Sequence, residues 1–159
     1  MGTSTIQTAS LTFSGSTLNL NSASASLVFT GNTDLYYKAN NLNLSFSALS
    51  VVANSNMIIQ YSLNAGNLVL GRASNLLVKD GKTVSVSSLT GNGDCGNFST
   101  LRGYCGTDPF TWPDDNCMMS IPEIHASSDI NIDFVKLAYI SRTGANFIAA
   151  DSYDQGNVS

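Results

Sequence analysis

The chain of 159 residues has few charged side chains, because Asp, Glu, Lys and Arg make up only 11% of it, against roughly 25% in an average soluble protein. Seven Lys and Arg face eleven Asp and Glu, which gives a formal net charge of −4. The sequence has no basic cluster that would neutralise a run of phosphates, the main source of nucleic-acid affinity. We therefore expect no nucleic-acid partner. Solubility that rests on hydroxyl and amide groups instead suggests a virion or extracellular surface.

Long apolar runs are also missing. No segment approaches the roughly 20 apolar residues that span a bilayer. The N-terminal residues 1–5 have neither the basic stretch nor the apolar centre of a signal peptide. We therefore expect no membrane insertion and no signal peptide in the given chain.

Good helix formers are scarce, since the chain has one glutamate and is rich in Ser, Thr and Asn. Apolar and polar residues instead alternate with period 2, as in residues 9–13 and 42–46, which is typical of half-buried strands. The dipeptide Asp80-Gly81 between two such runs predicts a hairpin. The sequence therefore predicts an all-β fold, an antiparallel β-sandwich or jelly roll. One domain over residues 1–150 and an extended tail over residues 151–159 are expected.

A weak internal repeat offers an alternative architecture. The pattern x-Leu-x-Leu occurs three times at similar spacings, at positions 17–20, 41–44 and 67–70. Repeats with a spacing of this order also occur in parallel β-solenoids. A parallel β-solenoid is therefore the second fold that the sequence allows.

Residues rare elsewhere are concentrated in one stretch between Asp94 and His125. It contains every cysteine and proline of the chain and its single Trp, His and Glu. We expect a long loop over residues 91–118 that carries recognition, because loops on a rigid scaffold often carry function. Its exposed aromatic residues would form the interface: Phe98, Tyr104, Phe110 and Trp112.

Two kinds of structural link are compatible with this loop. The three cysteines, Cys95, Cys105 and Cys117, allow one disulfide and leave at least one thiol free. Their wide spacing argues against a zinc site with His125. The carboxylates of Asp108, Asp114 and Asp115 are oxygen ligands of the type that calcium prefers, although they do not follow the EF-hand pattern. Calcium is the one cofactor that the sequence suggests.

The sequence contains no phosphate-binding glycine loop, nucleophile elbow or paired acid and base. We therefore expect a protein that is not an enzyme: a structural or assembly subunit of a virion or an extracellular filament, with copies of itself or other structural proteins as partners. The alternative is a carbohydrate-binding module that uses the aromatic loop. Residues 129–137 resemble the final strand of jelly-roll carbohydrate-binding modules, which implies the same sandwich fold and a glycan partner.

Overall fold

The computed structural model describes residues 4–8, 12–13, 20–29, 32–37, 44–107 and 120–156. These residues form strands, turns and bends, so the all-β prediction is confirmed for them. The same part of the chain has no helix of the length and apolar character that crossing a membrane requires.

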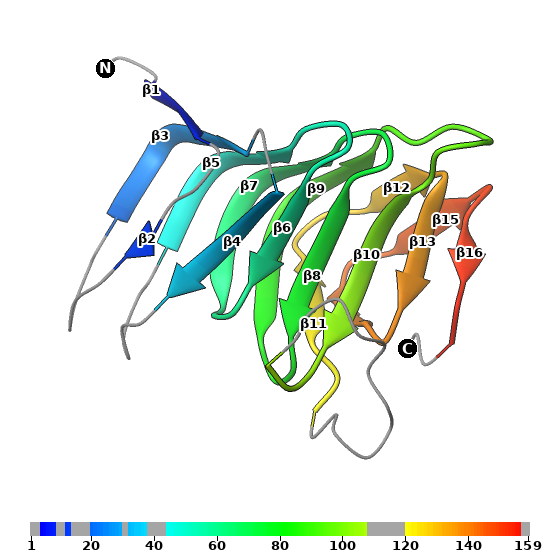
Figure 1. Cartoon of the computed structure of the whole chain (residues 1–159). Coiled ribbons are helices and arrows are strands. Elements are labelled where there is room, and N and C mark those ends of the chain that lie inside the picture. The colour runs from blue at the N-terminus through cyan, green and yellow to red at the C-terminus, as the bar shows by residue number, and fades with distance from the viewer. Residues whose placement is uncertain are drawn as a thin grey trace.

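The strands form two large sheets and one small sheet (Figure 1). The first sheet has seven strands in the order β1 (Ser4–Thr8), β3 (Leu20–Phe29), β5 (Leu44–Val51), β7 (Leu63–Leu70), β9 (Thr83–Gly91), β11 (Glu123–Ala126) and β14 (Ser141–Gly144). The second sheet has seven in the order β16 (Tyr153–Asp154), β13 (Val135–Ala138), β10 (Ser99–Tyr104), β8 (Asn75–Lys79), β6 (Asn56–Ile59), β4 (Asn32–Tyr37) and β2 (Thr12–Phe13). The small sheet pairs β12 (Ile130–Asp133) with β15 (Phe147–Ala150).

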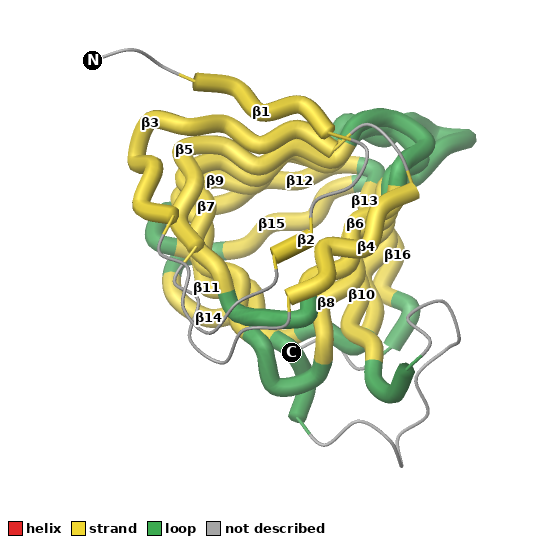
Figure 2. Tube along the Cα trace, turned by 60° about the vertical axis from the view of Figure 1, so that its left-hand side comes forward, coloured by secondary structure: helices red, strands yellow, loops and turns green. Residues whose placement is uncertain are grey.

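Every pairing between these strands is parallel. Successive strands from β1 to β10 alternate between the first and the second sheet, so the chain winds around one axis. Each coil places its strands beside those of the coil before it. Figure 2 shows the resulting stack from one end, with the two large sheets enclosing the interior. The architecture is a parallel β-solenoid.

The expected antiparallel β-sandwich or jelly roll is therefore wrong, and the parallel alternative fits the structure better. Alternation shows which side chains face a core but not the direction in which neighbouring strands run. The Asp80-Gly81 turn illustrates the error. It joins β8 to β9, which belong to different sheets, and only Gly81 has a positive φ, of 66°. A type I′ hairpin requires a positive φ at both residues.

The x-Leu-x-Leu repeat is partly a true structural repeat. Leu20 pairs with Leu44, so the first two occurrences of the pattern match the register of β3 and β5. Leu70 pairs instead with Val51, so the third occurrence is out of step. Coils differ in length, because Ser45 pairs with Asn64 whereas Thr83 pairs with Glu123, which follows a long insertion.

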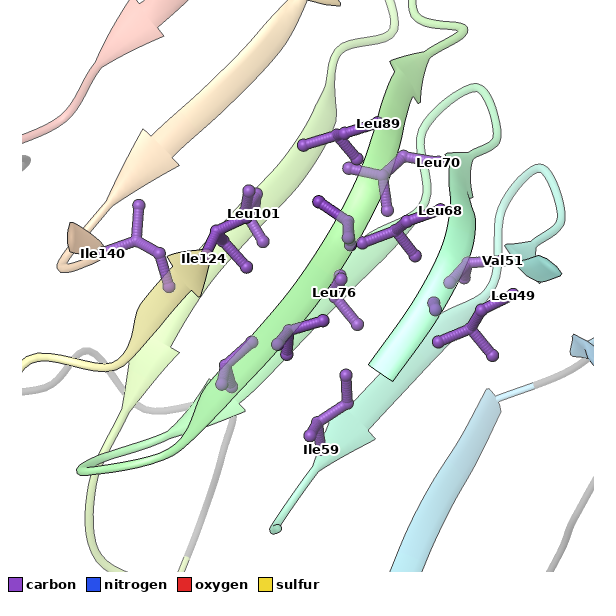
Figure 3. Close-up of a cluster of buried hydrophobic side chains, with 14 of the residues drawn as sticks. Leu49, Val51, Ile59, Leu68, Leu70, Leu76, Leu89, Leu101, Ile124 and Ile140 are labelled. Atoms are coloured by element: carbon purple, nitrogen blue, oxygen red, sulfur yellow. The ribbon is translucent and has the colours of Figure 1, made fainter. Parts of the chain in front are cut away.

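The core consists of aliphatic side chains stacked along the axis. Leu49, Leu68 and Leu89 occupy paired positions in successive coils of the first sheet and are at most 3% exposed. Leu76 and Leu101 form the facing stack in the second sheet, and both are fully buried (Figure 3). Each side chain packs on its equivalents in the coils above and below, about 4.8 Å away.

One corner of the solenoid repeats a left-handed backbone conformation. A positive φ occurs at Asn54, Ala73, Phe134 and Asp151, just before β6, near the start of β8, before β13 and before β16. The corner is tight: a Cβ atom added to Gly71 would lie 2.5 Å from the backbone nitrogen of Ala53. The hydroxyl of the buried Ser99 donates a hydrogen bond to the Gly71 carbonyl over 2.8 Å. Each of these corners leads the chain from one sheet to another, so that the next strand can pair in parallel. A hairpin would instead place two consecutive strands side by side in one sheet and antiparallel.

The predicted loop and tail also belong partly to the stack. The segment expected as a loop over residues 91–118 contains strand β10, which pairs with β8 and β13. Residues 151–156, expected in the tail, include β16, which pairs with β13. The stretch that resembled a jelly-roll strand is divided at Phe134 into β12 and β13, both of which pair in parallel. The sandwich fold implied by that resemblance is therefore wrong as well.

Truncating Leu76 to alanine tests the stacked core. We expect Leu76→Ala to lower the free energy of unfolding by about 2–5 kcal/mol, because the cavity lies between two coils that cannot close independently. Ile121→Ala is the matched control, since Ile121 is exposed and lines neither the groove beside Tyr153 nor the hollow at the C-terminal end of the stack, and its truncation should change stability by less than about 1 kcal/mol. Urea unfolding followed by circular dichroism measures both. Equal effects of the two substitutions would contradict the stacked core.

Candidate functional site

Three aromatic rings that are distant in sequence gather beside the second sheet at its β13–β16 side. The Phe98 ring lies 5.8 Å from Phe134 and 4.9 Å from Tyr153, measured between centroids. Register brings them together, because Ser99 pairs with Val135 and Lys136 pairs with Tyr153 (Figure 1). Tyr153 remains 57% exposed. A ring this exposed adds little to the core and is available for contact with another molecule.

A hollow of about 390 Å³ adjoins these rings. We call it the aromatic groove, and its lining residues are Cys95, Gly96, Phe98, Lys136, Tyr153 and Gln155. The Lys136 ammonium lies 5.7 Å from the centroid of the Phe98 ring, within the range of a cation–π interaction. The volume is within the range of small-ligand sites, roughly 300–1,000 Å³. The groove thus combines ring faces, one cation and an amide.

A well-ordered turn forms the rim of the aromatic groove. The Asp94 carboxylate accepts hydrogen bonds from the backbone N–H of Gly96 and the side-chain amide of Asn97, both over 3.0 Å. Its other oxygen lies 3.0 Å from Nε of Arg72. The Asn97 amide, then the Gly96 N–H and the Arg72 charge hold the pKa of Asp94 below its ordinary value, while desolvation acts in the opposite direction. Asp94 is therefore occupied within its own turn and paired with a cation outside the groove.

A second hollow lies at the C-terminal end of the stack. It has a volume of about 230 Å³, and its floor is formed by Leu101, Ile124, Leu137 and Ile140. Phe147, Ala149 and the polar residues Arg142, Ser152 and Asp154 also line it. Among the described strands, β14, β15 and β16 each pair on one side only. We call this hollow with its three strands the open end.

A third hollow crosses the outer side of the first sheet. It has a volume of about 340 Å³ and runs over four coils, with Ser45, Asn64, Ser85 and His125 at paired positions. Nδ1 of His125 lies 2.9 Å from the Thr143 hydroxyl, which itself donates to the Glu123 carboxylate. Because that hydroxyl proton is used on Glu123, Nδ1 acts as the donor to Thr143. These contacts account for the single histidine as part of a surface hydrogen-bond chain.

The predicted aromatic interface is only partly on the surface. Phe98 lies in the aromatic groove, whereas Tyr104 is 2% exposed and packs in a small buried cluster with Ile58 and Leu77. Phe110 and Trp112 lie outside the described residues. Tyr104 therefore does not offer its ring to a partner.

The structure describes only some of the residues predicted to form a disulfide or to bind calcium. Cys105 is disulfide-bonded, Cys95 is a free and exposed thiol, and Cys117 lies outside the described residues. Asp108, Asp114 and Asp115 lie outside them too, so calcium there stays a prediction. Within the described ranges no group of three or more His, Cys, Asp or Glu could hold a metal ion.

Sequence reasoning missed Phe134, Lys136 and Tyr153 as site residues. Tyr153 was expected in a tail, and Phe134 and Lys136 in the jelly-roll strand that residues 129–137 resemble. The signal that would have found them is the solenoid register, which pairs Lys136 with Tyr153. The coil from β13 to β16 is shorter than the coil from β3 to β5, so the Leu repeat could not reveal this pairing.

Comparison with known proteins adds no assignment. No protein-family model, curated protein or solved structure matches the chain.

The ionisation of Asp94 tests the geometry of the rim. We expect its carboxyl to titrate below the ordinary pKa of 3.8, and Asn97→Ala to raise the pKa more than Arg72→Ala, because the Asn97 hydrogen bond is the largest cause of the shift. A lowered pKa favours the folded state above the unfolded value, near pH 4, and this contribution is lost as the pH falls through the folded pKa. Carboxyl ¹³C NMR measures the titration. A pKa at or above 3.8, or a larger effect of Arg72→Ala, would contradict the described turn.

Proposed function

We propose that the chain is a structural subunit that assembles end to end with copies of itself, as part of a virion fibre or an extracellular filament. It is proposed to act without catalysis. The observation that carries the proposal is the open end, where an apolar hollow of about 230 Å³ is bounded by the edges of three strands.

The physical reason is the unsatisfied edge. A strand that pairs on one side presents backbone donors and acceptors to a further strand. At the open end, Ile148 is 57% exposed, and Ala149 at the hollow is exposed too. One more coil would pair with β14, β15 and β16 and cover the hollow. The surface thus favours a partner with the same cross-section.

The opposite end of the stack offers such a partner. β1 and β2 are the outermost described strands of the two large sheets. Residues 1–33 contain no Asp, Glu, Lys or Arg, and the first proline of the chain is Pro109. Natural edge strands that avoid association commonly carry Lys or Pro. This edge has neither protection.

The direction of the strands favours head-to-tail stacking of the copies over a contact between two identical ends. All strand pairs within the chain are parallel, and stacking the β1–β2 end of one copy on the open end of another continues that pattern. Two identical ends meeting about a two-fold axis would have to pair antiparallel. A head-to-tail contact is heterologous and does not close, so it generates a line of subunits.

Charged substitutions at the two ends test this assembly. Ile6 lies on the edge strand β1 in register with Leu27, which pairs with the buried Leu49. Ala149 lines the hollow at the open end. We expect Ile6→Lys and Ala149→Lys each to be monomeric by size-exclusion chromatography with light scattering, because the next coil would cover an ammonium group at either position and desolvate it. The unsubstituted chain should form linear oligomers whose mass rises with concentration.

Mixing the two variants distinguishes the geometry. Each variant retains one intact end, so the mixture should form a dimer and nothing larger. Thr90→Lys is the matched control, because Thr90 is exposed on β9 inside the first sheet, and it should assemble like the unsubstituted chain. A monomeric unsubstituted chain at all concentrations, or a mixture that stays monomeric, would refute head-to-tail assembly.

A further inference from the structure

The aromatic groove has a chemistry distinct from that of the open end. Its lining includes two aromatic rings, the Gln155 amide, and Lys136 as its one charged side chain. Tyr153 and Phe98 are tilted by 57° to each other, so they are not stacked face to face. Tyr153 is also 57% exposed, so its ring can pack against the flat face of a ligand.

The charge of the groove indicates the sign of the ligand. Within the described residues, the Lys136 ammonium makes no ion pair. The nearest acidic residue of the rim, Asp94, is held by Arg72, Gly96 and Asn97. A ligand that carries one negative charge would meet this ammonium without an internal carboxylate in competition.

We propose that the aromatic groove binds a sugar residue that carries a carboxylate, as part of a glycan. The C–H face of a sugar ring is apolar and packs on an aromatic ring, which Tyr153 and Phe98 provide. Hydroxyl groups at the edge of the sugar reach the Gln155 amide, and the carboxylate reaches Lys136. A single lysine matches one charged sugar and not the repeated phosphates of a nucleic acid.

The proposed glycan site lies at a different place from the one expected from the sequence. The expected site was the loop with Phe110 and Trp112, whereas the groove combines Phe98 with residues of β13 and β16. It does not depend on end-to-end assembly. The Ile6→Lys variant, which blocks the distant β1 edge, should bind the sugar as the unsubstituted chain does.

Binding of defined sugars to the Ile6→Lys chain tests the proposal. The probes are sialyllactose and a hyaluronan tetrasaccharide, with lactose as the uncharged comparison, acetate as the free carboxylate and a glutamate-rich peptide as a different acidic polymer. We expect NMR titration to show saturable shifts at Lys136 and Tyr153 with at least one of the acidic sugars. Lactose, acetate and the peptide should each bind about tenfold more weakly or not at all.

Two variants and a matched control test whether the acidic sugar contacts Tyr153 and Lys136. Tyr153→Ala and Lys136→Met should each weaken binding of the acidic sugar by about tenfold or more. Lys82→Met is the control, because the Lys82 ammonium also lies near an aromatic ring, 5.9 Å from the centroid of Tyr61, but outside the groove. Circular dichroism checks that all three variants are folded.

Four results would overturn the proposal. The first is that neither acidic sugar binds the folded chain. The second is that lactose, acetate or the peptide binds as tightly as the acidic sugars. The third is that Lys136→Met and Lys82→Met have equal effects, and the fourth is that Tyr153→Ala binds like the unsubstituted chain. Assembly measured on the unsubstituted chain is a separate readout, so failure here leaves the head-to-tail test intact.

Discussion

In-register parallel pairing between successive coils is the constraint on which the rest of the structure depends. Each coil satisfies its backbone donors and acceptors through its neighbours, and the same register places one aliphatic side chain on the next, as for Leu49, Leu68 and Leu89. In four of the described coils, a residue with positive φ turns the chain at the same corner. The end coils lack a neighbour on one side, so the constraint that stabilises the interior also creates the open end.

The class of the fold was accessible from sequence, but the direction of its strands was not. Period-2 alternation follows from a half-buried strand whether its neighbour runs parallel or antiparallel. Turn chemistry misled at Asp80-Gly81, because a corner of the solenoid uses the same residue types as a hairpin. The repeat was concealed by coils of unequal length and by the insertion between β10 and β11, which lies between Thr83 and its partner Glu123.

For the candidate site, too, the sequence indicated the region but not which of its aromatic side chains reach the surface. Phe98 was singled out because it lies in the most aromatic segment, and the structure places it in the lining of a surface groove. Its neighbours Phe134 and Tyr153 come from other coils, and nothing local in the sequence links them. Tyr104 belonged to the same segment but is buried with Ile58 and Leu77. Aromatic composition therefore located a region, whereas register decided which rings reach the surface.

Disulfide trapping tests the register of the stacked coils most directly. Asn67 and Ser88 are paired across β7 and β9, and their side chains are 2.9 Å apart. In a Cys95→Ser background, Asn67→Cys combined with Ser88→Cys should form a disulfide, identified by peptide mapping without reduction. Asn67→Cys with Thr90→Cys should not, because a shift of two residues moves the Cα atoms beyond the roughly 7 Å that a disulfide spans. Trapping of the second pair, or absence of the first in folded protein, would contradict the stacked solenoid.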